Sequence, residues 1–233
     1  MPFHLGTVLA CSSCMPRPPR NAILGDEPAT IHFIWRCHNR DFLMQAEEFK
    51  IDYLGLLRKH KEQYGIEVYA YALMDNHFHA VLHLPDRTSW QRFSRRANSL
   101  LARKINRATK RSGQVVMDRP RTIVLERDQD VLAVMRYIDL NPVRAGIVRR
   151  AREYRWSSYR HHATGHRDEL IDPCPAVQRL GRSPGARCVA YRELFAVDHQ
   201  LNRVRRQELV AVYFLGRDSW VLERQQHLRR PPQ

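Results

Sequence analysis

The pattern of apolar and polar positions predicts two adjacent strands near the middle of the chain. From 77 to 84 apolar residues alternate with histidine and valine, so a strand here is apolar on one face only. The preceding run 68–73 is rich in residues that favour strands, and Met-Asp-Asn at 74–76 is typical of a turn. The two runs therefore predict a β-hairpin that places His77 and His79 side by side on one face.

The same periodicities predict the remaining elements of a core. Two further stretches alternate with period two, and three others have apolar residues at steps of three and four. The strands are expected at 30–36 and 122–126, and the helices at 45–64, 89–110 and 131–140. Strands and helices in this order predict an α+β fold, with an antiparallel sheet and helices mainly against one face, plus a small helical C-terminal extension.

Composition divides the chain into four parts. Residues 1–28 are rich in Pro and Arg, which is typical of a flexible basic leader. The core is predicted at 29–160, and the Pro- and Gly-containing stretch 161–185 is expected to be a linker. The last part, 186–233, has helical patterns and many arginines, which favour a small accessory DNA-binding module.

The overall charge points to a polyanionic partner. The chain has 39 Lys and Arg against 24 Asp and Glu, a formal net charge of +15 and a pI of about 10.2. A protein with this excess binds phosphates through the release of counterions. No apolar run approaches the roughly 20 residues that span a bilayer, and no secretory leader is recognisable. We therefore expect nucleic acid rather than a membrane as the partner, and a cytoplasmic location.

The helix predicted at 89–110 concentrates this charge. Its apolar stripe should lie on the sheet, and its other faces are basic without any acidic residue in the helix. The basic residues are Arg92, Arg95, Arg96, Arg103, Lys104, Arg107, Lys110 and Arg111. A run of charges is usually a solvated face, but the lack of internal partners favours DNA phosphates as theirs.

The histidine pair has the spacing of a metal site. Side chains at i and i+2 of a strand point the same way, so the rings of His77 and His79 can reach one divalent ion. A pair of histidines on a half-buried strand can equally be polar residues at a wet face. The pattern alone does not choose between these two interpretations.

Three motifs resemble the HUH single-tyrosine transposases, in particular the REP-associated branch. Asn76-His-Phe-His79 is similar to the family's PNHVHLLL, with Asp75 where the family has Pro. Residues 136–148 are similar to RYIHLNPVRAGLV, and residues 156–159 match WSSY. The resemblance implies a ferredoxin- or RRM-like HUH core, single-stranded or hairpin DNA as the partner, and Mg or Mn held by His77 and His79.

The resemblance also implies a tyrosine that attacks a DNA phosphodiester. We align residues 102–113 with a family stretch similar to ARRYNRRHGRSG, which places Ile105 at the tyrosine and Thr109 where a third metal ligand can stand. Because an alkyl side chain cannot attack phosphorus, this alignment predicts impaired cleavage. The other tyrosines that could stand in are Tyr69, Tyr71, Tyr137, Tyr154 and Tyr159.

Three functions remain open at this point. The first is a transposase-like protein that binds DNA for transposition or for site-specific single-strand cleavage and rejoining; whether it is an active enzyme stays undecided. The second is a non-catalytic DNA-binding or regulatory relic of a transposase. The third is an RNA-binding module, although the glycine-aromatic signature of such sheets is missing. Arg136 and Arg144 are further expected DNA contacts, and both a monomer and a homodimer are consistent with the family.

Overall fold

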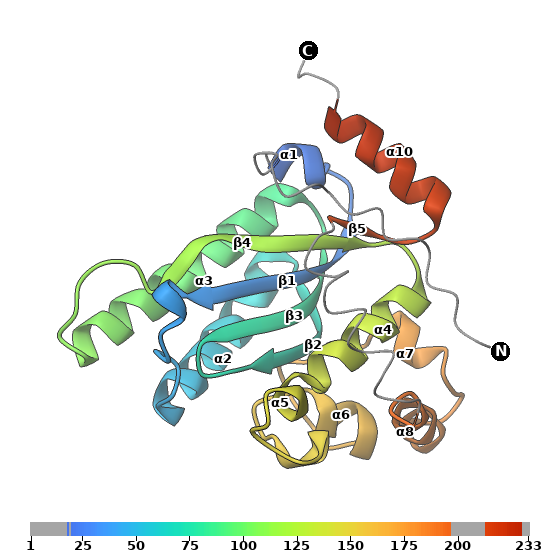
Figure 1. Cartoon of the computed structure of the whole chain (residues 1–233). Coiled ribbons are helices and arrows are strands. Elements are labelled where there is room, and N and C mark those ends of the chain that lie inside the picture. Colours follow the sequence, from blue (N-terminus) through green and yellow to red (C-terminus); the bar gives the residue numbers. More distant parts are fainter. Residues whose placement is uncertain (1–17, 19, 197–212, 230–233) are drawn as a thin grey trace.

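A five-stranded sheet forms the centre of the protein, in the order β2-β3-β1-β4-β5. The computed structural model describes residues 18, 20–196 and 213–229 (Figure 1). The strands are β1 (Ala29–Cys37), β2 (Glu67–Leu73), β3 (His77–Leu84), β4 (Val116–Leu125) and β5 (Phe214–Leu215). All neighbouring strands are antiparallel except β4 and β5, which are parallel. The predicted α+β class is therefore confirmed.

Helices connect the strands and extend the chain after them. They are α1 (Arg20–Ile23), α2 (Glu47–Lys61), α3 (Arg87–Ala108), α4 (Asp128–Asp139), α5 (Asn141–Arg144), α6 (Tyr159–Thr164), α7 (Pro175–Gln178), α8 (Pro184–Glu193) and α10 (Asp218–Arg229). Short 3-10 turns lie at His38–Arg40, Glu62–Tyr64 and Ala151–Glu153. Within the described residues, no helix combines the length and the apolar character that crossing a bilayer requires.

The long helices α2 and α3 pack on one face of the sheet, behind the strands in Figure 1. Phe78, Ala80, Leu82 and Leu84 of β3 point into this layer and are buried, as their alternation predicts. α3 contributes its apolar stripe, which includes Ile105, to the same core. Both helices have defined ends: Gly65, at φ 62°, closes the turn after α2, and the Asp86 carboxylate accepts the Ser89 backbone N–H at 2.8 Å to cap α3.

The opposite face is covered in part by α4, which packs on β2, β3 and β4. Val134 and Ile138 of α4 contact a smaller apolar cluster that includes Val81 and Ile123 of the sheet. The remainder of this face carries polar side chains, among them His77. The sheet thus has one apolar face under two long helices and one mixed face that α4 covers in part.

β4 is longer than the 122–126 predicted from the sequence. The pairing with β1 shifts between Ile34, opposite Arg121, and Arg36, opposite Met117. Pro120 falls in this irregular stretch, where the lack of an N–H is tolerated because the ladder is already broken. Because Pro120 interrupts the strand-like pattern, the sequence did not predict the first half of β4.

The stretch 161–185 is a packed part of the fold rather than the predicted linker. It contains α7 and the end of α6, and it buries Leu170, Cys174 and Val177 against the two cores. These apolar residues lie between Pro and Gly too sparsely to form a periodic pattern. The chain therefore has no separate core ending at residue 160.

The predicted terminal parts are partly described. The leader 1–28 was expected to be flexible, yet it contains α1, and Leu24 is buried in the main core. The C-terminal module was expected to be helical from 201 to 220; residues 197–212 lie outside the described part, and Phe214–Leu215 form the edge strand β5. The end of the chain thus completes the sheet instead of folding as a separate unit.

Candidate active site

His77 and His79 lie side by side on the mixed face of the sheet, the one that α4 partly covers. Their ring centroids are 5.0 Å apart, with an interplanar angle of 89°. In the antiparallel register His77 is opposite Arg36 and His79 is opposite Ile34 of β1. The hairpin and the alternation therefore bring these two rings together as the sequence predicts.

Asn141 joins the two histidines and was not among the predicted site residues. It is 9% exposed and lies where α4 ends and α5 begins. Its Oδ1 lies 3.2 Å from His77 Nε2, and its Nδ2 lies 3.2 Å from His79 Nε2. Within the described residues no group of three or more His, Cys, Asp or Glu gathers for a metal ion. The Asn141 amide oxygen is a candidate third ligand because it lies beside His77 Nε2.

The outer nitrogens of both rings are engaged elsewhere. His77 Nδ1 lies 2.6 Å from Asn76 Oδ1, and His79 Nδ1 lies 3.0 Å from His32 Nε2. Since the Asn76 oxygen can only accept, His77 donates its Nδ1–H and keeps the lone pair of Nε2 facing Asn141 Oδ1. A cation between Nε2 and Oδ1, which lie 3.2 Å apart, would satisfy both of these acceptors.

The spacing of these atoms suits a small divalent ion. Ligand atoms bound to one ion at about 2.1 Å, and about 90 to 100° apart, are separated by about 3 Å. The 3.2 Å between Asn141 Oδ1 and His77 Nε2 matches that separation, while His79 Nε2 faces the Asn141 amide nitrogen at the same distance. The donor set of two imidazoles and one amide oxygen therefore fits a metal ion.

Burial keeps the inner imidazoles neutral. The pKa of His79 is held well below its usual value, first by burial and then by the nearby rings of His32 and His77 and the charges of Arg36 and Arg144. Burial and Arg121 lower the pKa of His32 to about 3. Neutral imidazole is the form that binds metal, so His79 needs no proton loss at neutral pH.

Tyr137 is the tyrosine that lies against this cluster. It lies four residues before Asn141, the first residue of α5, and both side chains face the histidines. Its ring meets His79 edge-on at 5.8 Å between centroids and meets His32 at 5.9 Å. The Arg144 guanidinium carbon lies 4.1 Å from the centroid of the Tyr137 ring. The Tyr137 ring is therefore in contact with the imidazoles of His32 and His79 and with the Arg144 guanidinium.

The other tyrosines considered from the sequence have structural tasks. The Tyr69 hydroxyl donates a hydrogen bond to Glu67 at 2.6 Å, and the Tyr71 hydroxyl donates one to Asp168 at 2.7 Å. The Tyr154 hydroxyl donates to the Leu73 carbonyl at 2.7 Å. The pKa of each of these three hydroxyls is raised, first by burial. Tyr159 packs edge-on against Phe195 at 5.0 Å. None of these four contacts the histidine pair.

Ile105 is not at the site, and the alignment that placed the nucleophile there is wrong for this fold. Ile105 is 0% exposed, in the core between α3 and the apolar face of the sheet. Thr109, the expected third ligand, donates its hydroxyl to the Ile105 carbonyl at 2.7 Å. Because strand side chains alternate, the sheet itself separates both residues from His77 and His79. An isoleucine at 105 therefore says nothing about cleavage.

The predicted DNA contacts divide between the two faces. On α3 and just after it, all eight basic positions are exposed except Arg111, which is half-buried, and Lys104 pairs with Asp52 of α2. They lie on the far side of the sheet from the histidines. Arg144 is half-buried beside Tyr137, and Arg136 is only 8% exposed. The basic helix α3 and the metal-binding candidates thus lie on opposite faces of the sheet.

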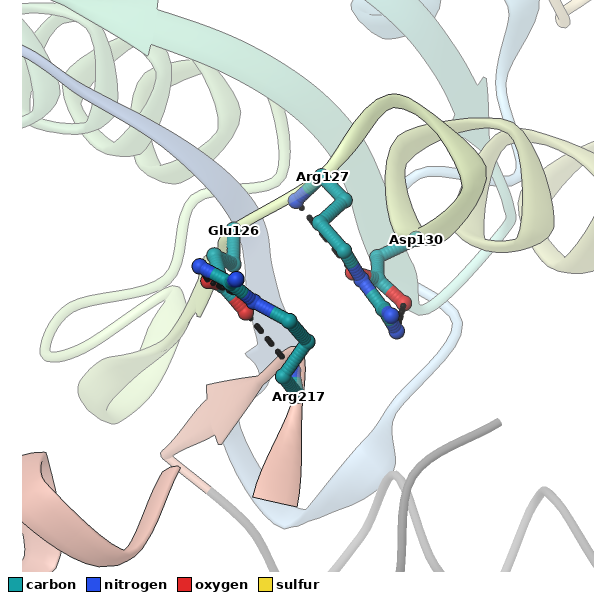
Figure 2. Close-up of polar contacts among 4 residues, drawn as sticks. All are labelled: Glu126, Arg127, Asp130 and Arg217. Carbon is teal, nitrogen blue, oxygen red and sulfur yellow. Dashed lines mark hydrogen bonds and ion pairs between the residues drawn. The ribbon is translucent and has the colours of Figure 1, made fainter. Parts of the chain in front are cut away.

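Two ion-pair contacts determine where α4 begins (Figure 2). The Asp130 carboxylate accepts the Arg127 backbone N–H at 3.2 Å and its guanidinium at 2.8 and 3.1 Å. The adjacent Glu126 accepts the Arg217 guanidinium at 2.8 and 2.6 Å, which ties the residue after β4 to the second residue after β5. Tyr137 follows Asp130 by two helical turns, so these contacts set its position along the sheet.

The C-terminal end of α4 is anchored from the other side. Asp139 is fully buried and accepts hydrogen bonds from the Tyr191 hydroxyl at 2.7 Å and from Ser158 Oγ at 3.3 Å. Burial raises the pKa of Asp139 to about 7, against the opposing effect of these two hydrogen bonds. Ser158 belongs to the WSSY motif, whose backbone runs beside β2, with Tyr71 O accepting the Ser158 N–H at 2.9 Å. The motif therefore holds the helix that carries Tyr137.

Comparison with known proteins shows that residues 27–121 are similar to a known protein family. Residues 27–121 match the model of the family described as "Transposase IS200 like". Among solved structures, a REP-associated tyrosine transposase bound to a REP hairpin is 16% identical, with 70% of this chain and 93% of that chain covered and a TM-score of 0.48. A putative transposase from Deinococcus radiodurans R1 is 18% identical over 48% of this chain and 89% of that chain, with a TM-score of 0.35. No curated protein matches.

The matched family segment contains β1, the hairpin with His77 and His79, and α3, while Tyr137 and Asn141 lie beyond it. The resemblance seen in the motifs is thereby confirmed, and it supports a transposase-like, DNA-binding role. Residues 27–121 of this chain are thus similar to the IS200-like transposase family.

Proposed function

We propose that this protein binds DNA and cleaves and rejoins one strand through a transient bond between Tyr137 and a phosphate. The observation that carries the proposal is the meeting of Tyr137, Asn141 and the two histidines on one face of the sheet. Chemistry of this kind needs a nucleophile beside groups that hold the phosphate. The Ile105 position has no part in it.

His77, His79 and Asn141 would hold a divalent ion, with Mg or Mn favoured by a site that mixes nitrogen and oxygen ligands. When bound, the ion supplies polarisation of the phosphate. The protein contributes the remaining steps. The Tyr137 oxygen attacks phosphorus, the bond from phosphorus to the 3′ oxygen breaks, and the phenol proton is lost as the 3′ oxygen gains one. Rejoining is the reverse attack by a 3′-hydroxyl, which frees the tyrosine.

Arg144 is suited to hold the phosphate during this reaction. Its guanidinium stacks on the Tyr137 ring, and it donates a hydrogen bond to the Tyr137 carbonyl. Arg36 and Arg121 come from neighbouring strands on the same face, so positive charge surrounds the histidines. A planar guanidinium beside the nucleophile can bind a phosphate oxygen while the ring stays oriented.

The exposed basic residues of α3 would form a second contact to DNA. They lie on the face of the sheet away from Tyr137, so one DNA molecule would have to wrap around an edge to touch both places. Single-stranded DNA bends more readily than a stiff duplex, and this favours single strands or hairpins with single-stranded flanks. Contacts to phosphates make the affinity fall steeply with salt.

The test is covalent capture of DNA. The native protein is incubated with Mn²⁺ and a pool of labelled hairpins with single-stranded flanks, then run on a denaturing gel. We expect a labelled protein band with native protein and with the Tyr64→Phe control, whose ring lies on the α3 side against Phe93. Tyr137→Phe should lose the band. A band that persists in Tyr137→Phe would reject Tyr137 as the nucleophile, and the lack of any band with native protein would favour the non-catalytic relic.

A further inference from the structure

We propose that His32 is a positioning residue that fixes the tautomer and the orientation of His79. The proposal deepens the function proposed above, because its consequence for metal binding rests on His79 being a ligand. The link between the two rings is itself independent of any metal. His32 is neither part of the sequence motifs nor in contact with the DNA-binding candidates on α3.

The geometry ties the two rings closely. His32 Nε2 lies 3.0 Å from His79 Nδ1, and the rings stack with centroids 5.2 Å apart at an interplanar angle of 28°. His32 is 0% exposed and His79 is 3% exposed. The Tyr137 ring closes the third side, edge-on to both. A hydrogen bond and a ring stack in a buried place leave His79 little freedom to rotate.

The hydrogen bonds select one tautomer for each ring. Asn141 Nδ2 can only donate, so His79 Nε2 accepts from it and the His79 proton lies on Nδ1. His32 Nε2 must then accept this proton, which leaves the proton of His32 on its own Nδ1. That buried Nδ1 has no hydrogen-bond partner within the described structure. A polar atom left unpaired in the core is uncommon and asks for an explanation.

The positioning role provides that explanation. With its proton on the unpaired Nδ1, His32 has a free lone pair on Nε2, and this nitrogen accepts the Nδ1–H of His79. The strand register makes this contact available, since Val81 is opposite His32 and His79 is its diagonal neighbour on the same face. Metal-binding histidines commonly donate their outer N–H to a second group, and loss of that group weakens metal binding by about 10- to 100-fold.

A matched control exists on the same two strands. Thr30 Oγ1 of β1 lies 3.1 Å from His83 Nδ1 of β3, two residues further along the same face. Thr30→Val therefore removes the same kind of contact between β1 and a β3 histidine, away from the site. His32→Phe keeps the ring stack and the volume but removes the acceptor, and His32→Gln offers an acceptor again.

The experiment has two readouts. Long-range nitrogen–proton NMR of the full chain without metal reports the tautomer of His79. Calorimetric titration with Mn²⁺ reports the affinity. In native protein and in Thr30→Val we expect the His79 proton on Nδ1. In His32→Phe we expect a mixture of tautomers and an affinity for Mn²⁺ lower by about 10- to 100-fold. His32→Gln should lie closer to the native protein in both measurements.

The two readouts separate the failures. If native protein binds no Mn²⁺, the proposed metal site is wrong, and the NMR tautomer still decides the role of His32. If His32→Phe keeps the native tautomer of His79, the positioning role is overturned whatever the affinity. Circular dichroism checks that each variant is folded. Should His32→Phe fail to fold, His32→Leu takes its place under the same criteria.

Discussion

The two faces of the sheet differ in what their helices do. On one face α2 and α3 bury an apolar layer that contains Phe33, Trp35 and Phe78. On the other face α4 crosses beside the buried histidines His32 and His79. A helix whose apolar stripe closes a core has no side chain left for chemistry on that stripe. A helix that crosses a polar face can supply a reactive group.

This difference explains the misplaced nucleophile. The apolar stripe of α3, the strongest helical pattern in the chain, ends at Ile105 inside the core. Tyr137 and Asn141 have the helical spacing i and i+4, but they are polar positions in two short helices, at the end of α4 and the start of α5. The basic residues of α3 lie on the face of the sheet opposite the histidine pair. The protein presents its charge and its proposed chemistry on opposite sides.

The largest expected effect separates the faces directly. Tyr137→Phe should reduce covalent DNA capture by roughly 10³-fold or more, since nothing else at the site can form a bond to phosphorus. Adding Ile105→Tyr to this variant should not restore capture, because residue 105 lies across the sheet. Quantified adducts on denaturing gels check both statements. Restored capture in the double variant would mean that the two faces are not chemically separate.

The next effect concerns the anchor of α4. The folded pKa of Asp139, about 7, lies above its ordinary value, so the folded state holds an extra proton and loses stability as pH rises from about 4 to 7. Asp139→Asn removes this loss. We expect the variant to gain free energy of unfolding relative to the native protein over that window, by at most about 1.4 kcal/mol per pH unit. Urea unfolding at pH 4 to 8 measures the difference, and a difference that does not change with pH contradicts the expectation.

A smaller effect sharpens the description of the apolar face. Ile105→Tyr should destabilise the fold by about 1 to 3 kcal/mol, because a larger polar side chain is forced into a filled core. Val189→Tyr is the matched control, since Val189 is an exposed apolar residue on α8. Thermal or urea unfolding compares them. Equal stabilities of the two variants would show that residue 105 is not packed as described.

The smallest effect concerns the charged surface. Replacing Arg92, Arg95 and Arg96 together by Gln should weaken DNA binding and flatten its salt dependence, by about 0.7 to 0.9 in the logarithmic slope for each phosphate that these side chains no longer neutralise. Removing the exposed Arg152, Arg167 and Arg182 lowers the net charge equally and serves as the control. Fluorescence titrations at several salt concentrations give the slopes. A slope equal to that of the control would remove α3 from the DNA surface.

Much of the framework was predictable because it depends on local periodicity. The alternation from 77 to 84 correctly indicated which side chains share a face, and Gly65 marked the end of the first long helix. The missed parts lacked such a signal. Pro120 hid half of β4, and the buried residues between 161 and 185 are held by contacts with both cores rather than by a repeat of their own.

The sequence by itself determined which residues could share a strand face or a helix face, because these follow from repeats of two and of about 3.6 residues. It also determined the excess of positive charge and the presence of paired imidazoles. Only the tertiary structure decided which helix covers which face of the sheet. That choice depends on packing between segments far apart in the chain, and it is what brings His32, Tyr137 and Asn141 to the histidine pair and leaves Ile105 in the core.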